Sequence, residues 1–311
     1  MTSPRVSVLM TAFNREEYIA AAIDSVLAQT FTDFELVIVD DVSTDATLAI
    51  ARAYEARDPR VRVVVNASNL GDYPNRNRAA SLARGEFLKY HDSDDVMYPH
   101  CLQTMVQALG EEPRADFALT TSRAWAGGPT PMLLTPRMCY AREYLGEGMF
   151  HGGPACALFR RAAFERLGPF PLHGTISDFH FWLQACRRAY VLLVAGDLFW
   201  YRVHEGQSML SAAGKRDRAA HEGVAWAALF HPDCPLTGDD LEQARRNRLT
   251  GVVRRAIRDA LTGDPRFAVA RLRATGARPW DWVRYVGRRR IDYSAGTPSI
   301  AATRREPVVR A

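Results

Sequence analysis

The sequence predicts an α/β fold in which a mostly parallel central sheet carries helices on both faces and is followed by a C-terminal helical extension. Short apolar segments rich in Val, Ile and Leu alternate with segments of helical periodicity through the first hundred residues. Such alternation is typical of parallel sheets that are covered by helices. Arg-rich segments of amphipathic helical pattern replace this alternation after about residue 206, which indicates the extension.

The expected elements follow from this pattern in order. Strands are predicted over residues 5–11, 34–39, 61–65, 86–90, 117–122, 155–160, 191–194 and 199–203. Helices are predicted over residues 18–27, 46–56, 75–83, 99–109, 161–167 and 179–188. Asn14 is expected to cap the first helix and Ser43-Thr44-Asp45 the second. Residues 125–150 hold several Gly and Pro residues and are expected to form a loop or lid.

The stretch GEFLKYHDSDDVMYP, residues 85–99, is the centre of the prediction. It is a short strand followed by three carboxylates, Asp92, Asp94 and Asp95. Three carboxylates this close repel one another unless a cation or an array of donors neutralises them. At the carboxyl end of a parallel strand they lie where α/β sheets bind ligands, and hard oxygen ligands suit Mg²⁺ or Mn²⁺. The alternative is a solvated acidic turn, and Asp95 is assigned to capping the next helix.

Polar residues follow other strands in the same way, because Thr11 and Asn14 follow the first strand and Asp40 and Asp41 the second. The carboxyl ends of parallel strands meet at one edge of a sheet, so these side chains are expected to converge with Asp92 and Asp94. Convergence is what favours a binding site over a set of unrelated turns.

Composition fits an ordinary globular protein of 311 residues with a formal charge of +5 and a pI near 9.1. The five cysteines contain no Cys-x-x-Cys pair, so neither a disulfide framework nor a zinc site is predicted, and a reducing compartment is favoured. Apolar runs are too short to span a bilayer or to form a signal sequence. We therefore expect a cytoplasmic protein, with peripheral contact on the inner face of the cell membrane as the alternative through the Arg-rich segments near Trp280 and Trp282.

Several motifs together carry a family resemblance. They are VSVLMTAFN, SVLAQTF, ELVIVDD, STD, NRNRAASLARGEFLKYHDSDD, LFRRAAFERLGPF, SDFHFWLQA and WYRVHEGQSM, in this order over residues 5–210. The chain resembles family 2 glycosyltransferases, which have the Rossmann-like GT-A fold. The resemblance implies an inverting enzyme, and the absence of the Gln-x-x-Arg-Trp motif of processive synthases implies a non-processive one. It also implies a catalytic domain over 1–210, with a nucleotide-binding half (1–100) and an acceptor half (101–210), a helical extension over 211–290 and a tail over 291–311 expected to be disordered.

The resemblance implies a nucleotide-sugar site on the first half of the chain. Thr11, Ala12 and Phe13 would hold the nucleotide, with the Phe13 ring against the base where the family usually has Tyr. Asp41 would accept a hydrogen bond from a pyrimidine imide, or is only a turn residue. Further contacts are implied for Arg76, which would approach the diphosphate, and for Asp92 and Ser93 near the ribose or the metal.

The resemblance also implies the catalytic residues. Asp94 and His204 would hold the divalent cation, Mn²⁺ or Mg²⁺, and Asp178 would be the general base. The open alternatives are a helix N-cap for Asp178 and an ordinary strand-end histidine for His204. This sequence departs from the family at Val42, where a Gly is usual, and at Ser177, where the first acid of a Glu-Asp pair is usual.

These residues predict a metal-dependent glycosyltransferase (EC 2.4) that moves a sugar from a UDP-sugar to an acceptor hydroxyl, with a dTDP-sugar as the other donor considered. The acceptor is a carbohydrate, a glycolipid or a small molecule, in polysaccharide, glycolipid or natural-product synthesis. Nucleic acid is not an expected partner, because the extension lacks a recognised motif and the crevice is acidic. The functional alternative is a non-catalytic scaffold of the same fold docked at a membrane, and the extension is open to forming a homodimer.

Overall fold

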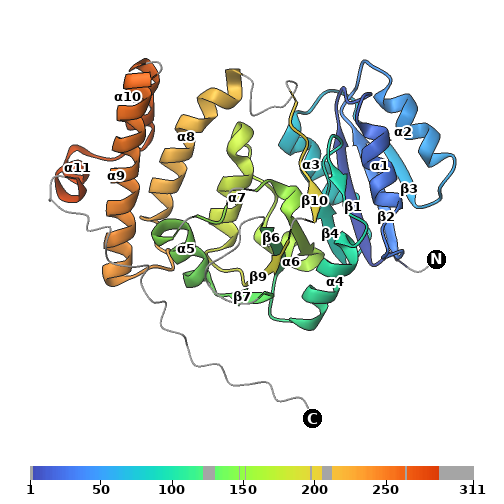
Figure 1. The fold of residues 1–311 in the computed structure, drawn as a ribbon, viewed down its shortest axis with the longest axis horizontal. Helices are drawn as coiled ribbons and strands as arrows, with labels where there is room; N and C mark the ends of the chain where they lie inside the picture. Colours follow the sequence, from blue (N-terminus) through green and yellow to red (C-terminus); the bar gives the residue numbers. More distant parts are fainter. Residues whose placement is uncertain are drawn as a thin grey trace, which may run out of the picture.

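The computed structural model describes residues 3–121, 130–146, 148–150, 152–196, 198–204, 212–262 and 265–286. Within these residues an eight-stranded sheet has the strand order β3-β2-β1-β4-β8-β6-β9-β7. Figure 1 shows the sheet flanked by helices, with the last four helices stacked at one end of the molecule. The predicted fold class is confirmed.

The first half of the sheet is parallel and is formed by β1 (Val6–Ala12), β2 (Phe34–Asp40), β3 (Val61–Val65) and β4 (Phe87–Tyr90). Helices α1 (Ile19–Leu27), α2 (Thr47–Glu55) and α3 (Asp72–Ser81) connect these strands. The register pairs Ala12 with Asp40 and Leu9 with Tyr90, so the strands end at one edge of the sheet.

The second half of the sheet is mixed. β8 (Ala157–Arg160) runs antiparallel to both β4 and β6 (Phe117–Thr121), β9 (Val191–Ala195) is parallel to β6, and β7 (Met132–Leu134) closes the edge antiparallel to β9. A separate two-stranded ribbon pairs β5 (Val96–Met97) with β10 (Phe199–Trp200). This ribbon brings the chain after residue 198 back beside the acidic turn that follows β4.

Alternating strand residues bury the two faces of the sheet in two separate cores. Leu9, Val37 and Val39 point into one core, together with α3, α5 (Pro136–Leu145) and α7 (Ser177–Ala185). Val8 and Met10 point into the other, against α1 and α4 (Cys101–Glu111). Both faces of the sheet are buried, because parallel strands that are covered by helices on both sides carry apolar side chains on each face.

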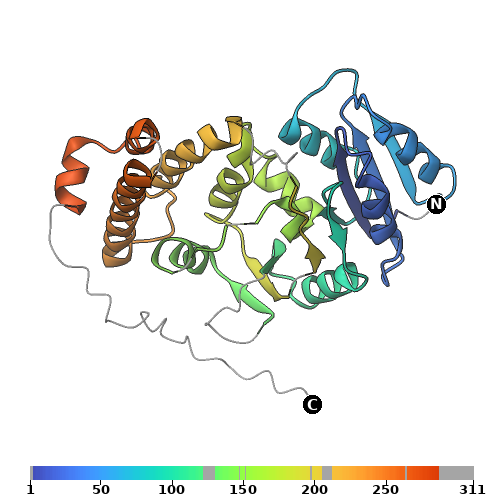
Figure 2. The ribbon, with the colours of Figure 1, turned by 45° about the horizontal axis from the view of Figure 1, so that its top comes forward.

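The extension consists of α8 (Ala212–Ala228), α9 (Gly238–Thr262), α10 (Pro265–Ala274) and α11 (Pro279–Tyr285). Figure 2 shows these helices beside α5 and α7 rather than detached from them. Their apolar residues join the same core as the sheet, including Trp226, Leu249 and Tyr285, and the Tyr144 hydroxyl donates to the Ala225 carbonyl at 2.8 Å. Among the described helices, none is long and apolar enough to cross a membrane.

The structure corrects several local predictions. α1 begins at Ile19, and Asn14 does not cap it: its φ is 51°, and its side-chain oxygen accepts from the Thr44 N–H at 2.8 Å. Asp95 does not cap a helix either, because it is buried and accepts from the Arg202 N–H at 3.0 Å.

The expected loop or lid over residues 125–150 is wrong where the structure describes it. β7 and α5 lie there, and the Thr135 side chain accepts from the Met138 N–H with Pro136 in the first turn. Pro is well suited to a first turn, where its missing N–H is no loss. Residues 122–129, His151 and the tail after residue 286 lie outside the described residues.

Candidate active site

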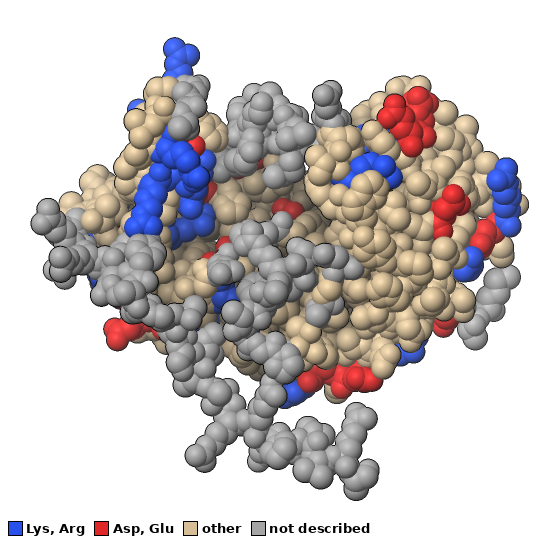
Figure 3. Space-filling view, in the orientation of Figure 1, with Lys and Arg blue, Asp and Glu red and all other residues tan. Residues whose placement is uncertain are grey.

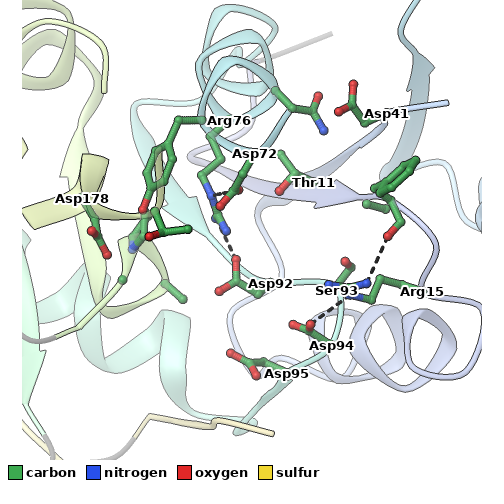
Figure 4. Close-up of a pocket in the computed structure, with 18 of the residues that line it drawn as sticks. Thr11, Arg15, Asp41, Asp72, Arg76, Asp92, Ser93, Asp94, Asp95 and Asp178 are labelled. Atoms are coloured by element: carbon green, nitrogen blue, oxygen red, sulfur yellow. Dashed lines mark hydrogen bonds and ion pairs between the residues drawn. The ribbon is translucent and has the colours of Figure 1, made fainter. Parts of the chain in front are cut away.

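One cleft of about 660 Å³ lies at the carboxyl edge of the parallel strands. It is lined by most of the residues that the sequence singled out: Thr11, Ala12, Phe13, Asp41, Arg76, Asp92, Ser93, Asp94 and Asp178. Figure 4 shows Asp41 at one end and Asp178 at the other, with Arg76, Asp92 and Asp94 between them. The predicted convergence of the strand ends is confirmed.

The end of the cleft beside β1 and β2 combines an exposed ring with a buried carboxylate. Phe13 is 44% exposed at the end of β1, whereas Asp41 is buried. Asp41 Oδ1 accepts from the Asn66 side chain at 2.6 Å and the Leu70 N–H at 2.8 Å, and Oδ2 accepts from the Gly71 N–H at 2.9 Å. Since each carboxylate oxygen has two lone pairs, Oδ2 keeps one for a donor in the cleft.

Val42, next to Asp41, has φ of 64°, a left-handed conformation that is rare for a β-branched residue. The usual Gly at this position would adopt it without strain. Val42 thus adopts a conformation that a Gly would adopt more easily, at some cost in stability.

Arg76 is the electrostatic centre of the cleft. Its guanidinium lies 2.7 Å from Asp72 Oδ1 and 2.7 Å from Asp92 Oδ1, and the side chain is almost fully buried on α3. Burial opposes the ionisation of Asp92, but the charge of Arg76 and its hydrogen bond outweigh burial and lower the pKa of Asp92. Asp92 is therefore a charged carboxylate that already has a counterion.

Asp94 has two side-chain nitrogens close to one of its oxygens. Its Oδ2 lies 3.0 Å from His204 Nε2 and 3.0 Å from Arg15 Nε. The His204 ring packs on Tyr18, with 4.6 Å between the ring centroids. The described residues contain no set of three His, Cys, Asp or Glu side chains that could hold a metal ion by themselves.

Arg15 was not predicted to be part of the site. Besides Asp94, its Nη1 donates to the carbonyl oxygens of Phe13 at 3.2 Å and Asn14 at 2.9 Å, so it joins the end of β1 to the acidic turn (Figure 4). A basic residue directly after the strand-end Asn, in a site rich in carboxylates, was the available signal.

Asp95, the third carboxylate of the acidic turn, is buried at the wall of the cleft. Burial and the charge of Asp92 raise the pKa of Asp95 to about 7, although the Arg202 N–H hydrogen bond opposes this shift. Arg202 also donates from Nε to the Asp94 carbonyl at 2.9 Å, and its guanidinium lies 4.6 Å from the Trp200 ring centroid. The segment after β10 thus fixes the turn that carries Asp92 and Asp94.

Asp178 stands at the far end of the cleft, in the first turn of α7. Burial raises the pKa of Asp178 to about 6, while the Phe179 N–H, the charge of Arg76 and a hydrogen bond with Tyr73 oppose the shift. A methyl group on Gly153 would lie 3.8 Å from Asp178 Oδ2, so the glycine keeps space open in front of the carboxylate. A carboxylate with a pKa near 6 is suited to taking a proton at neutral pH.

Comparison with known proteins decides the family. The model of glycosyl transferase family 2 matches residues 7–168, more than half of the chain. The chain belongs to glycosyl transferase family 2. This confirms the predicted class of enzyme, a glycosyltransferase.

Two relatives illustrate the match. EpsH of Bacillus subtilis is 32% identical over 218 residues, which are 66% of this chain and 62% of EpsH. The glycosyltransferase GlyG of Streptococcus pneumoniae is 32% identical over 110 residues, 35% of this chain and 36% of GlyG. The matches thus span less than two thirds of the length of these family 2 relatives.

Solved structures share the fold across the extension as well. TarS 1-349 of S. aureus in complex with UDP-GlcNAc has a TM-score of 0.66 and 22% identity, covering 90% of this chain and 81% of that one. The mannosyltransferase PcManGT from Pyrobaculum calidifontis, in complex with GDP-Man and Mn²⁺, has a TM-score of 0.60 and 20% identity, covering 91% and 85%. At this identity the likeness shows the fold alone.

Proposed function

We propose that this family 2 chain transfers a sugar from a UDP-sugar to an acceptor hydroxyl with inversion at the anomeric carbon. The observation that carries the proposal is one cleft with the exposed Phe13 ring and the Asp41 carboxylate at one end and Asp178, a carboxylate of raised pKa, at the other. UDP and dTDP both offer an imide N–H to the remaining lone pair of Asp41. A solved structure of the same fold holds UDP-GlcNAc, which supports a nucleotide-sugar donor.

The donor diphosphate would lie between Phe13 and Asp178. Thr11, Ala12 and Ser93 would contact the nucleotide sugar from the strand ends, and Asp92 would lie near the ribose or the cation. Arg76 would contribute positive charge to the diphosphate, although Asp72 and Asp92 already share its guanidinium. Arg76 thus lies between two carboxylates, and the diphosphate would share its positive charge with them.

Asp94 and His204 would hold a divalent cation, Mn²⁺ or Mg²⁺. The fit is supported by the approach of His204 Nε2 to Asp94 Oδ2, two donors of the kind that bind these ions. With two protein donors among the described residues, oxygens of the diphosphate would complete the coordination. When bound, the cation acts as a Lewis acid that stabilises the charge of the leaving diphosphate.

Asp178 would act as the general base. Its carboxylate accepts the proton of the acceptor hydroxyl while the hydroxyl oxygen forms a bond to the anomeric carbon and the bond from that carbon to the diphosphate oxygen breaks. Base and leaving group lie on opposite sides of the sugar in this arrangement, so the displacement inverts the anomeric configuration. The absence of the processive Gln-x-x-Arg-Trp motif favours the addition of one or a few sugars.

The extension is the proposed site of peripheral membrane contact. Arg side chains gather over α9 and α10 on the face shown in Figure 3, and the helical row Arg254, Ile257, Arg258 and Leu261 of α9 is exposed. Arginines beside exposed apolar residues are suited to anionic headgroups. Co-sedimentation of the full chain with anionic vesicles at low salt, and its absence with neutral vesicles, is the expected result. A homodimer through the same helices would instead raise the mass in light scattering without vesicles.

Calorimetric titration of UDP with and without Mn²⁺ tests the donor site, on the wild-type chain and on Asp94→Ala. We expect binding of UDP that is tightened by Mn²⁺ in the wild-type chain and indifferent to Mn²⁺ in Asp94→Ala. Glu86→Ala is the matched control, because Glu86 is a surface carboxylate outside the cleft. Absence of UDP and dTDP binding under both conditions would contradict the donor proposal and favour a non-catalytic scaffold. A screen of UDP-sugars for UDP release then identifies the sugar.

A further inference from the structure

We propose that Asp217, on α8 of the extension, is a positioning residue for Asp178, so that the extension forms part of the active site. The inference rests on the proposed role of Asp178 as the base. Asp217 does not belong to the described residues that line the cleft, and its effect is therefore transmitted through the turn that leads into α7.

Asp217 binds this turn at Thr175. Its Oδ2 accepts from the Thr175 N–H at 2.8 Å and from the Thr175 hydroxyl at 3.0 Å. Thr175 lies in the short 3₁₀ turn η2 (Gly174–Ile176), which directly precedes α7, and it lines the cleft three residues before Asp178. A carboxylate that binds both the backbone and the side chain of one residue fixes its position and its rotamer.

Gly174 permits the close approach of Asp217. Its φ is 63°, which favours glycine, and a β-carbon at this position would collide with the Asp217 carboxylate. Two independent features of one residue thus leave room for Asp217. The carboxylate lies directly against the backbone of the turn rather than reaching it through a long side chain.

Ser177 holds the same turn from within. Its hydroxyl donates to the Gly174 carbonyl at 2.7 Å and accepts from the His173 N–H at 2.9 Å, and the residue is fully buried. In the family resemblance this position is usually an acid beside the base. Here the residue before the base is Ser177, a neutral side chain that hydrogen-bonds within the turn. The acid that contacts the turn is Asp217 of the extension.

α8 also contacts the chain immediately after Asp178. The rings of Phe179 and His221 stack, with 3.7 Å between centroids and 24° between planes. Figure 1 shows α8 lying alongside α7, between it and α9. Residues on both sides of Asp178 are therefore held by one helix of the extension, through a hydrogen-bonded carboxylate on one side and an aromatic contact on the other.

The consequence for catalysis follows from the demands on a general base. A base must lie within hydrogen-bond reach of the hydroxyl, and a displacement near 1 Å can cost about 100-fold in rate. A displaced Asp178 would leave donor binding untouched, because the nucleotide contacts lie at the other end of the cleft. Loss of Asp217 is thus expected to lower kcat while leaving the KM for the donor and the affinity for UDP unchanged.

The test compares Asp217→Ala and Asp217→Asn with the wild-type chain. UDP affinity is measured by calorimetry with Mn²⁺, thermal unfolding by circular dichroism, and kcat by UDP release from the UDP-sugar found in the donor screen. Hydrogen–deuterium exchange of residues 174–180 gives a readout that needs no substrate. Asp239→Ala is the matched control, because it removes the same charge from an exposed position in the first turn of α9.

We expect Asp217→Ala to lower kcat about 10- to 100-fold, to speed exchange over residues 174–180 and to keep UDP affinity within about two-fold (about 0.4 kcal/mol) of wild type. Asp217→Asn keeps an oxygen that accepts from Thr175, so its kcat should stay within about three-fold of wild type.

Unchanged kcat in Asp217→Ala, or an equal loss in Asp239→Ala, would overturn the inference. Loss of UDP binding together with a lower melting temperature would also overturn it, by assigning Asp217 a role in global stability. Failure of the wild-type chain to bind UDP would instead refute the proposed function, so the two failures are distinguishable.

Discussion

Asp92 and Asp178 lie in the same cleft, yet the protein treats these two carboxylates in opposite ways. Asp92 has a buried guanidinium 2.7 Å away, and its pKa is lowered; Asp178 has no ion pair of this kind among the described residues, and burial raises its pKa to about 6. A counterion makes a permanent charge, whereas burial without one makes a proton acceptor. The comparison indicates that electrostatic environment, rather than residue type, distinguishes the proposed donor side from the proposed acceptor side.

The largest expected effect tests the acceptor side. Asp178→Asn removes the proton acceptor but keeps the shape of the side chain, so kcat for UDP release should fall by roughly 10²–10⁴-fold. UDP affinity should be unchanged, because the nucleotide contacts lie at the other end of the cleft. Steady-state kinetics beside calorimetry measures both quantities. A variant that retains most of its kcat would remove Asp178 from the role of base.

The next effect tests the donor side. Arg76→Met leaves Asp92 without its buried counterion, and the free energy of unfolding in urea at pH 7 should fall by about 3–5 kcal/mol. Asp72→Asn is the control, since Asp72 is 41% exposed in its side chain and such pairs contribute at most about 1 kcal/mol. Equal effects of the two substitutions would show that Arg76 is not the specific counterion of Asp92.

A smaller effect is expected at Phe13, where a substitution should change nucleotide binding without changing stability. Phe13→Ala should weaken UDP binding by about 1–3 kcal/mol, the usual worth of stacking a base on an aromatic ring. Phe13→Tyr, which restores the residue usual in the family, should bind UDP as tightly as wild type. Because Phe13 is 44% exposed, neither substitution should change the melting temperature much. Unaltered UDP affinity in Phe13→Ala would mean that the uracil ring does not stack on Phe13.

The smallest effect concerns the turn beside Asp41. Val42→Gly should raise the free energy of unfolding by up to about 1 kcal/mol, because left-handed conformation costs an L-residue about 1–2 kcal/mol and the added freedom of Gly in the unfolded chain offsets part of the gain. Val42→Ala keeps the strain and serves as the control. A lower stability of Val42→Gly in urea unfolding would mean that the Val42 side chain makes a contact that outweighs the strain.

The sequence predicted features that are set by residues close together in the chain better than features that are set by contacts between residues far apart in the chain. The strand ends that carry Thr11, Asp41 and Asp94 follow from apolar periodicity, and their meeting follows from the rules of parallel sheets. Helix α5 was missed because its apolar and polar residues are not separated onto two faces at helical spacing, although Thr135-Pro136 is a recognisable helix start.

The contacts of Arg15 and Asp217 could not be predicted in the same way. Arg15 meets Asp94 across 79 positions of the sequence, and Asp217 meets Thr175 across 42. No local pattern specifies either pairing, because both arise only when separate layers pack together. The proposed role of the extension thus depends on tertiary structure, whereas the family was recognised from motifs at the strands.

The pH dependence of kcat/KM for the UDP-sugar tests the central contrast most directly, because kcat/KM reports the pKa values of the free enzyme. The groups facing Asp178 are Arg76, Asp72 and Tyr73 of α3 and the Phe179 N–H of its own helix, and their balance with burial gives a pKa of about 6. The ionised form is the active one, so kcat/KM should be constant above about pH 7 and fall as the pH drops through 6, approaching tenfold per pH unit below it. A limb near pH 4, the ordinary range of an aspartate, would contradict the account, because Asp178 would then carry no imprint of its burial.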